Sequence, residues 1–158
     1  MVIVQESDFD GAALQAALRE QVGAQAGAIV TFTGYVRDFA PEQSTETLFL
    51  EHYPGMCERE LHEIAETARQ RWQLAGTVIA HRVGALSRQA QIVFVAAASA
   101  HRGDAFRGCE YMIDALKTRA PFWKRETLSD GNSFWVQARQ ADQDRTDAWN
   151  TAEASAAD

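Results

Sequence analysis

Lysine is almost absent from this chain. Of the 15 basic side chains, only Lys117 and Lys124 are lysines, and the rest are arginines. An amine can lose its proton when it is desolvated and then act as a base or nucleophile, whereas a guanidinium stays charged. A composition biased toward arginine explains the scarcity of lysine, but it does not explain why both lysines lie seven residues apart in one stretch. This placement favours a chemical role for the stretch.

Cysteine is scarce as well. Cys57 and Cys109 are far apart in the sequence and form no C-x-x-C pair, which excludes a zinc knuckle and a redox dithiol. Both are expected to be small buried hydrophobic residues. The four histidines have no metal-ligand spacing, so the sequence predicts neither a metal site nor a cofactor.

Positive charge and long apolar runs are also lacking. The net charge is −7, which argues against binding to nucleic acid or to an anionic membrane surface, so any anion site must be local. An RNA-binding module that stacks bases on Phe122 and Trp123 is disfavoured for the same reason. No run approaches the roughly 18 apolar residues of a membrane span, and the N-terminus is acidic where a signal peptide is basic. We therefore expect a cytoplasmic protein.

The length of 158 residues and the 46% hydrophobic content suit one domain with a substantial core. Apolar periodicity predicts strands over residues 1–4, 28–36, 45–53, 77–83, 91–98, 122–127 and 134–137. It predicts helices from a cap at Ser7 or Asp8 to residue 22, over 56–72 and over 104–118. Strand 91–98 is nearly all apolar and is expected to be central, and residues 84–90 are expected to be a connection.

This mixed order predicts an α+β domain over residues 1–138, with helices packed on a mixed, largely antiparallel sheet. Beyond it the chain becomes polar, acidic and rich in alanine, and Trp149 is its only large apolar residue. We expect residues 139–158 to form a mobile tail that is free to dock on a partner.

The stretch from Lys117 to Glu126 places four cations within nine residues. The dipole at a helix C-terminus explains cations such as Lys117 and Arg119. It does not explain Lys124 and Arg125, which lie beyond Pro121, and strand alternation sends these two side chains to opposite faces. At most one of them can share a pocket with Lys117.

Three further segments combine a strand end with polar side chains. His101 and Arg102 lie between an apolar strand and a helix start, where free amide groups can bind a phosphate or carboxylate. Arg37 follows the strand that contains Tyr35 and Val36, and on its own is equally consistent with a solvated loop charge. His52 lies at a strand-to-helix corner, where a structural role is expected.

These segments, in this order, resemble the family of large catalytic subunits of molybdopterin synthase, over roughly residues 27–138. The motifs that carry the resemblance are Gly34-Tyr35-Val36-Arg37, Leu50-Glu51-His52-Tyr53-Pro54-Gly55-Met56, His81-Arg82-Val83-Gly84, Ser99-Ala100-His101-Arg102, and Leu116-Lys117 through Lys124-Arg125-Glu126. The last is the most specific. The resemblance implies an α/β hammerhead-type α+β fold and a dimer of this chain at the centre of a heterotetramer.

The resemblance also implies the activity and the partners. The chain would be a sulfurtransferase of molybdenum cofactor biosynthesis that acts with a small ubiquitin-like sulfur-carrier subunit. The carrier's C-terminal Gly-Gly thiocarboxylate would enter the pocket of this chain and donate sulfur to cyclic pyranopterin monophosphate, and two transfers would give the dithiolene of molybdopterin. A thiocarboxylate is itself a sulfur nucleophile, so no activated cysteine is needed.

Site roles follow the resemblance residue by residue. Lys117 would be the essential lysine, acting in acid–base chemistry or on the carrier's terminal carbonyl, and Lys124 the second catalytic lysine. The substrate would also contact Tyr35, Val36, Arg37, His101, Arg102, Arg125 and Glu126. Of these, Arg37, His101 and Arg102 would hold its phosphate and the charge that develops during transfer, and Arg125 and Glu126 would complete the substrate-facing segment. Two departures are Tyr35, where some members carry a basic residue, and Asp104, an acid near the proposed anion site.

One alternative remains open from the residues. A binding module without catalysis could hold a ubiquitin-like partner or a phosphorylated metabolite through the same basic groups. Such an anion clamp should tolerate arginine in place of Lys117 and Lys124, whereas a catalytic amine should not.

Overall fold

The computed structural model describes residues 1–37, 45–137 and 140–154, with side chains up to residue 149. The strands within these ranges are β1 (Val2–Gln5), β2 (Ala28–Tyr35), β3 (Thr45–His52), β4 (Gly76–Arg82), β5 (Gly84–Ser87), β6 (Gln91–Ser99), β7 (Phe122–Leu128) and β8 (Ser133–Val136). The helices are α1 (Gly11–Val22), a short 3₁₀ helix (Gly23–Gln25), α2 (Met56–Arg71), α3 (Arg102–Thr118) and α4 (Gln140–Ala154). The domain is α+β, as the sequence predicts.

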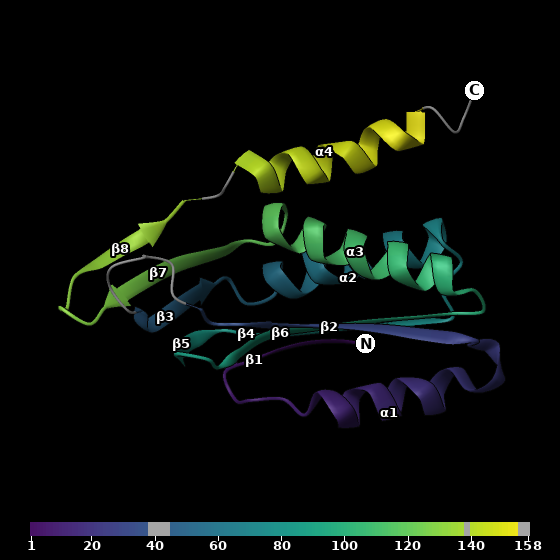
Figure 1. Ribbon diagram of the computed structural model, residues 1–158, viewed down its shortest axis with the longest axis horizontal. Helices are drawn as coiled ribbons and strands as arrows, with labels where there is room; N and C mark the ends of the chain where they lie inside the picture. The colour runs from purple at the N-terminus through teal and green to yellow at the C-terminus, as the bar shows by residue number, and fades with distance from the viewer. Residues whose placement is uncertain (38–44, 138–139, 155–158) are drawn as a thin grey trace.

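The first sheet has the strand order β1-β4-β6-β2 and lies between two layers of helices. In it, β1 is parallel to β4, and the other pairs are antiparallel. Helix α1 covers one face, and α2 and α3 cover the other (Figure 1). Side chains of β6 alternate between the two cores: Phe94 and Ala96 pack on the α1 side, and Val95 and Ala97 on the α2 and α3 side. The central position predicted for this apolar strand is confirmed.

A second, fully antiparallel sheet has the order β5-β3-β7-β8 and lies at one end of the molecule (Figure 1). The sequence predicts one sheet and a connection over 84–90, and both expectations are wrong. Gly84 has φ 74°, a conformation open to glycine, and the chain there leaves the first sheet and enters the second as β5. A third cluster of buried side chains, Val36, Leu48, Leu50 and Leu86, packs on this sheet.

The first helix begins later than predicted. Asp10, and not Ser7 or Asp8, is its N-cap, because its backbone is extended and its Oδ1 accepts hydrogen bonds from the amides of Ala12 (2.9 Å) and Ala13 (3.0 Å). Asp8 instead accepts a bond from the amide of Phe9.

The C-terminal segment differs from the mobile tail that composition predicts. Residues Gln140–Ala154 form helix α4, which packs along α3 (Figure 1). Residues 138, 139 and 155–158 lie outside the described part, as do residues 38–44 between β2 and β3. Among the described helices, none is long and apolar enough to cross a membrane.

Candidate active site around the C-terminal end of helix α3

Lys117 lies in the last turn of α3, where the helix dipole favours a cation. Its side chain is 48% exposed, and its Nζ lies 3.2 Å from Oδ1 of Asp142 in the first turn of α4. Asp142 is the less exposed partner, at 23%. The candidate catalytic amine is therefore at the surface and is held by a carboxylate from another helix.

The nearby Arg119 has a structural role. Its Nε donates to Oε1 of Glu60 on α2 at 2.7 Å, and its Nη1 lies 3.4 Å from the Tyr111 hydroxyl. The bond to Glu60 ties the end of α3 to α2. The chain then passes Pro121 and enters β7, which carries the second half of the basic stretch.

Strand β7 sends Lys124 and Glu126 to one face and Arg125 to the other. Lys124 lies opposite Leu50 and Glu126 opposite Leu48, both members of the buried cluster on this sheet. Arg125 is exposed on the reverse face, where its guanidinium stacks over the rings of Phe49 (5.3 Å) and Trp135 (5.8 Å). The predicted alternation is confirmed.

Glu126 is fully buried, which the sequence alone does not indicate. Its Oε1 accepts a hydrogen bond from Oγ1 of Thr45 on the adjacent strand β3, and its Oε2 has no hydrogen-bond partner among the described residues. A buried carboxylate is costly unless it is bonded or paired. This arrangement points to a supporting role for Glu126 beneath Lys124, since its carboxylate is shielded from solvent in the single chain.

His81 lies where the two sheets meet. Its ring stacks on that of Phe122 at a centroid distance of 4.0 Å and an angle of 15°, and its Nδ1 lies 2.8 Å from the carbonyl oxygen of Arg82. Burial lowers the pKa of His81 to about 4, and electrostatic interactions with Lys124 and His52 add to the effect. A neutral imidazole thus lies close to the second lysine.

Strand β2 brings the predicted Tyr35 and Val36 to the same end of the molecule. Tyr35 follows a register shift after Gly34 and is 56% exposed, whereas Val36 is buried and its backbone pairs with Ala90 and Gln89. Arg37 is exposed and is the last described residue before the gap at 38–44. The side chain of Val36 is therefore closed to a substrate, and its backbone N–H and C=O are already hydrogen-bonded within the chain.

His101 and Arg102 lie at the opposite, N-terminal end of α3. They line a pocket of about 490 Å³ together with Gly27, Ala28, Ala100 and Gly103. A Cβ on Gly27 would lie 2.4 Å from the Ala100 carbonyl oxygen, so only glycine fits this wall. The pocket joins a histidine and an arginine to the amide groups of a helix N-terminus, which suits an anion.

The two halves of the predicted site do not meet within one chain. Fifteen residues of helix separate Arg102 from Lys117, which corresponds to about 22 Å along the axis at a rise of about 1.5 Å per residue. The structure thus groups Lys124 with Glu126, brings Val36 to the same sheet, and places His101 with Arg102 elsewhere.

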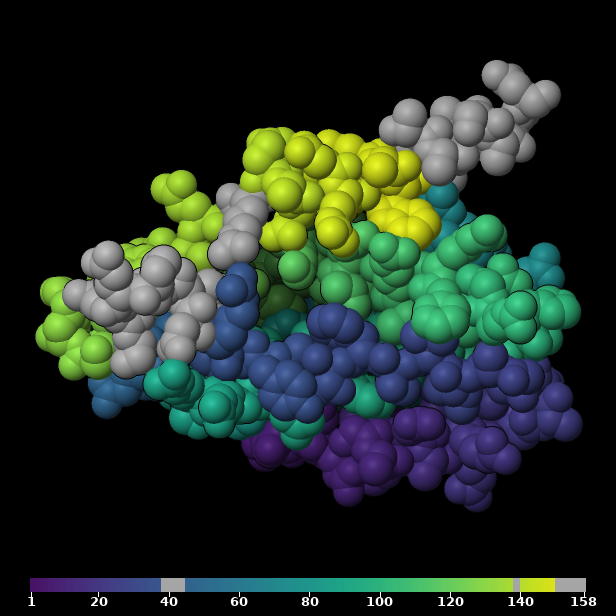
Figure 2. Space-filling model, viewed as in Figure 1, coloured from purple at the N-terminus to yellow at the C-terminus, as the bar shows by residue number. Residues whose placement is uncertain are grey.

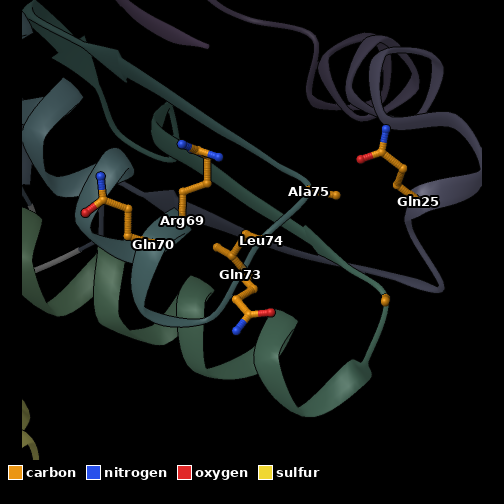
Figure 3. A pocket seen from close by; sticks show the side chains of 7 residues that line it. Gln25, Arg69, Gln70, Gln73, Leu74 and Ala75 are labelled. Atoms are coloured by element: carbon orange, nitrogen blue, oxygen red, sulfur yellow. The ribbon is translucent and has the colours of Figure 1, made fainter.

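A further hollow of about 420 Å³ lies between the end of α2 and the 3₁₀ helix (Figure 3). Its wall combines three glutamines with three apolar residues and Arg69, which is already bonded to Glu66 at 2.8 Å. None of the predicted site residues lines it.

The described residues offer no group of three or more His, Cys, Asp or Glu that could hold a metal. Cys57 and Cys109 are both buried, as predicted. Burial raises the pKa of the Cys109 thiol to about 11, so this thiol stays protonated and cannot serve as a nucleophile.

Comparison with known proteins decides the family. A family model described as MoaE protein matches residues 4–119. The chain belongs to the MoaE family. A molybdopterin synthase catalytic subunit from Ralstonia nicotianae is 47% identical to this MoaE chain over 156 residues, covering 98% of this chain and 88% of that protein. One from Pseudomonas aeruginosa is 48% identical over 147 residues, covering 92% and 96%.

The solved structures agree. Molybdopterin cofactor biosynthesis protein E from Burkholderia multivorans has a TM-score of 0.79 and 47% identity, covering 95% of this chain and 96% of its own. The predicted family and fold class are therefore confirmed for this MoaE chain. The family model ends at residue 119, so it includes Lys117 and stops before β7 and α4.

The sequence assigns no role to Thr45 and Asp142, or to His81 within its motif, although these residues lie around the candidate lysines and Glu126. The role of Asp142 could have been predicted, because Asp142, Thr146 and Trp149 have the i, i+4, i+7 spacing of one helix face. No sequence pattern could have predicted the role of Thr45, since its contact with Glu126 joins residues 81 positions apart.

Proposed function

We propose that this chain is the catalytic subunit of a molybdopterin synthase, a sulfurtransferase that acts with a small ubiquitin-like carrier. The carrier's terminal thiocarboxylate donates sulfur to cyclic pyranopterin monophosphate, so that a carbon–sulfur bond forms on the substrate. Water then cleaves the acyl–sulfur bond and leaves the carrier as a carboxylate. Two such transfers yield the dithiolene.

The observation that carries this proposal is an exposed amine, Lys117, at the end of α3, in a chain that is 47–48% identical to relatives named as catalytic subunits. Such a name implies another subunit, which supports a carrier as partner. An extended carrier tail can reach Lys117 because nearly half of this side chain is open to solvent.

Each group has a distinct task in this proposal. Lys117 contacts the terminal carbonyl of the carrier and handles protons there. Lys124, on the face of β7 above the buried Glu126, acts as the second lysine. Arg37, His101 and Arg102 hold the substrate phosphate, and the exposed Tyr35, next to the buried Val36 at the end of β2, contributes a further contact. Arg125 lies on the other face of β7 and contacts the substrate only if it is bound from that side.

A dimer of this chain is part of the proposal. Because His101 and Arg102 are about 22 Å along α3 from Lys117, one chain cannot place all three on a small substrate. A complete site then combines Lys117 and Lys124 of one copy with His101 and Arg102 of another. Two carriers on this dimer give the heterotetramer.

The test mixes the purified chain with thiocarboxylated carrier and cyclic pyranopterin monophosphate and measures molybdopterin. We expect product with the wild-type chain and a loss of at least about 100-fold with Lys117→Ala, while the affinity for the carrier stays within about threefold. Absence of product with a carrier that is competent with another synthase would contradict the proposed function.

Lys117→Arg and Lys124→Arg separate catalysis from simple anion binding. Both keep a positive charge, so a binding module would retain its function. We expect carrier binding to persist and turnover to fall in both variants. Normal turnover with arginine at both positions would show that no amine is required.

A further inference from the structure

The ammonium of Lys117 has a defined partner on α4. Its Nζ lies 3.2 Å from Oδ1 of Asp142, whose side chain is 23% exposed. A lysine on a flexible four-carbon stem otherwise loses considerable rotamer entropy when it is fixed. A reacting amine at the surface therefore needs such a partner to keep one position.

One face of α4 makes these contacts. Asp142, Thr146 and Trp149 follow one another at four and three residues, so they project from the same side of the helix. Thr146 Oγ1 donates to the carbonyl oxygen of Asp114 (3.2 Å) and is hydrogen-bonded with Thr118 Oγ1 (2.9 Å). The helix thus runs antiparallel to α3 and lies directly on it (Figure 2).

Trp149 anchors the far end of this face. Its Nε1 donates to Oδ2 of the buried Asp114 at 2.9 Å. Its ring meets those of Trp72 and Tyr111 edge to face, with centroids 5.5 and 5.8 Å away. Arg71 donates to the Trp149 carbonyl oxygen at 2.8 Å. These contacts fix α4 without any contribution from Asp142.

A purely structural ion pair is the competing explanation. Lys117 is in the last turn of α3 and Asp142 in the first turn of α4, so each charge is also favoured by its own helix dipole. An exposed pair of this kind contributes little to stability, however, and α4 is already held by Trp149. The contact matters more for where the amine lies than for whether the helix docks.

We propose that Asp142 is a positioning residue for Lys117. Helix α4 holds Asp142 in place, and Asp142 fixes the orientation in which the Lys117 amine faces the incoming carrier tail. This role rests on the proposed function, since it assigns Asp142 a part in the same reaction. It makes α4 a component of the site, although the matched family model ends at residue 119.

The first measurement needs no substrate. Because Lys117 and Lys124 are the chain's only lysines, acetylation by an N-hydroxysuccinimide ester followed by mass spectrometry reports on both amines separately. We expect Asp142→Asn to raise the labelling rate of Lys117 about fivefold, because its amine is no longer held in an ion pair, and to leave Lys124 unchanged. Asp144→Asn is the matched control, since Asp144 is an exposed acid of the same helix that accepts a hydrogen bond from Gln140, its neighbour on α4.

The second measurement is turnover of the full chain with carrier and substrate. We expect Asp142→Asn to lower kcat about fivefold. This value lies between the small energetic contribution of a surface ion pair and the roughly 100-fold loss of rate that a 1 Å misplacement of a reacting group causes. The melting temperature and the KM for cyclic pyranopterin monophosphate should stay near wild type. Asp142→Glu should recover part of kcat.

Faster labelling of Lys117 together with a lower kcat in Asp142→Asn supports the proposal. Unchanged labelling shows that the pair does not form in solution and overturns it. Changed labelling with an unchanged or higher kcat also overturns it, a higher kcat meaning that Asp142 competes with the carrier tail. Failure of the wild-type chain to make product contradicts the proposed function itself, whereas the labelling result still decides whether the pair exists.

Discussion

Lys117 and Lys124 differ in what the fold places beside them. Lys117 ends an exposed helix turn and meets a carboxylate, Asp142, whereas Lys124 lies on a strand above the fully buried Glu126 and close to His81. The first amine is thus open to a large partner such as a protein tail. The amine of Lys124 lies on the second sheet, where a small ligand could contact it.

The buried imidazole of His81 makes folding depend on pH. Its pKa is lowered from 6.5 to about 4, mainly by desolvation, so it is neutral in the folded chain at pH 7. Between pH 6.5 and 4 the unfolded chain takes up a proton that the folded chain does not, and stability falls as pH falls through this window. The full loss from this group is about 3 kcal/mol, reached near pH 4.

We expect His81→Gln to flatten this dependence. Urea unfolding at pH 6 and pH 5 should show that the wild-type chain loses about 1 kcal/mol more per pH unit than the variant does. His62→Gln, which removes an exposed histidine of α2, is the control and should keep the wild-type slope. Equal slopes for the wild-type chain and His81→Gln would contradict the assigned environment of His81.

Among the elements, α3 and β7 follow directly from sequence. Helix α3 carries Cys109, Met112 and Leu116 on one buried face, and Pro121 stops its continuation, so both periodicity and a breaker mark it. The alternation of Lys124 and Arg125 across β7 follows from strand geometry alone. For these two elements, the sequence pattern alone predicts which side chains face the core and which face the opposite side.

The elements that sequence does not predict depend on distant partners. Strand β5 has four residues, and only its pairing with β3, over thirty positions earlier in the chain, makes it a strand. Helix α4 is polar and has no broad apolar face, so its composition is typical of a mobile tail. Hydrogen bonds with α3 and the aromatic cluster around Trp149 hold it instead.

The Trp149 anchor of α4 can be tested through one hydrogen bond. Trp149→Phe keeps an aromatic ring but removes the donor to the buried Asp114, at an expected cost of about 1–2 kcal/mol in the local stability of α4. Hydrogen exchange should show faster exchange of α4 amides and unchanged protection of β6. Trp135→Phe, the same substitution at a tryptophan that is 53% exposed, should leave both unchanged. Unaltered exchange of α4 in Trp149→Phe would rule out Trp149 as the anchor.

At the scale of the whole molecule, the length of α3 separates the two groups of predicted site residues. The C-terminal end of α3 lies toward the second sheet, and its N-terminal end points away from it (Figure 1). Lys117 is in the last turn of α3 and Lys124 in β7, whereas His101 and Arg102 are at the start of α3. Sequence motifs name the candidate residues but do not predict this distance, because a motif does not show how many helical turns separate it from the next motif in the fold. A site shared between two copies reconciles the motifs with the geometry.

Mixed dimers test the shared site. Lys117→Ala and Arg102→Ala each damage both sites of a homodimer. A heterodimer of the two variants has one site with both residues intact and one with neither. Dimers that carry two different affinity tags, purified as heterodimers, should therefore have about half of the wild-type turnover, while each homodimer stays nearly inactive. Heterodimers as inactive as the homodimers would contradict the shared site, because they would show that Lys117 and Arg102 act within one chain. We do not expect this result, since roughly 22 Å of helix separates the two residues in one chain.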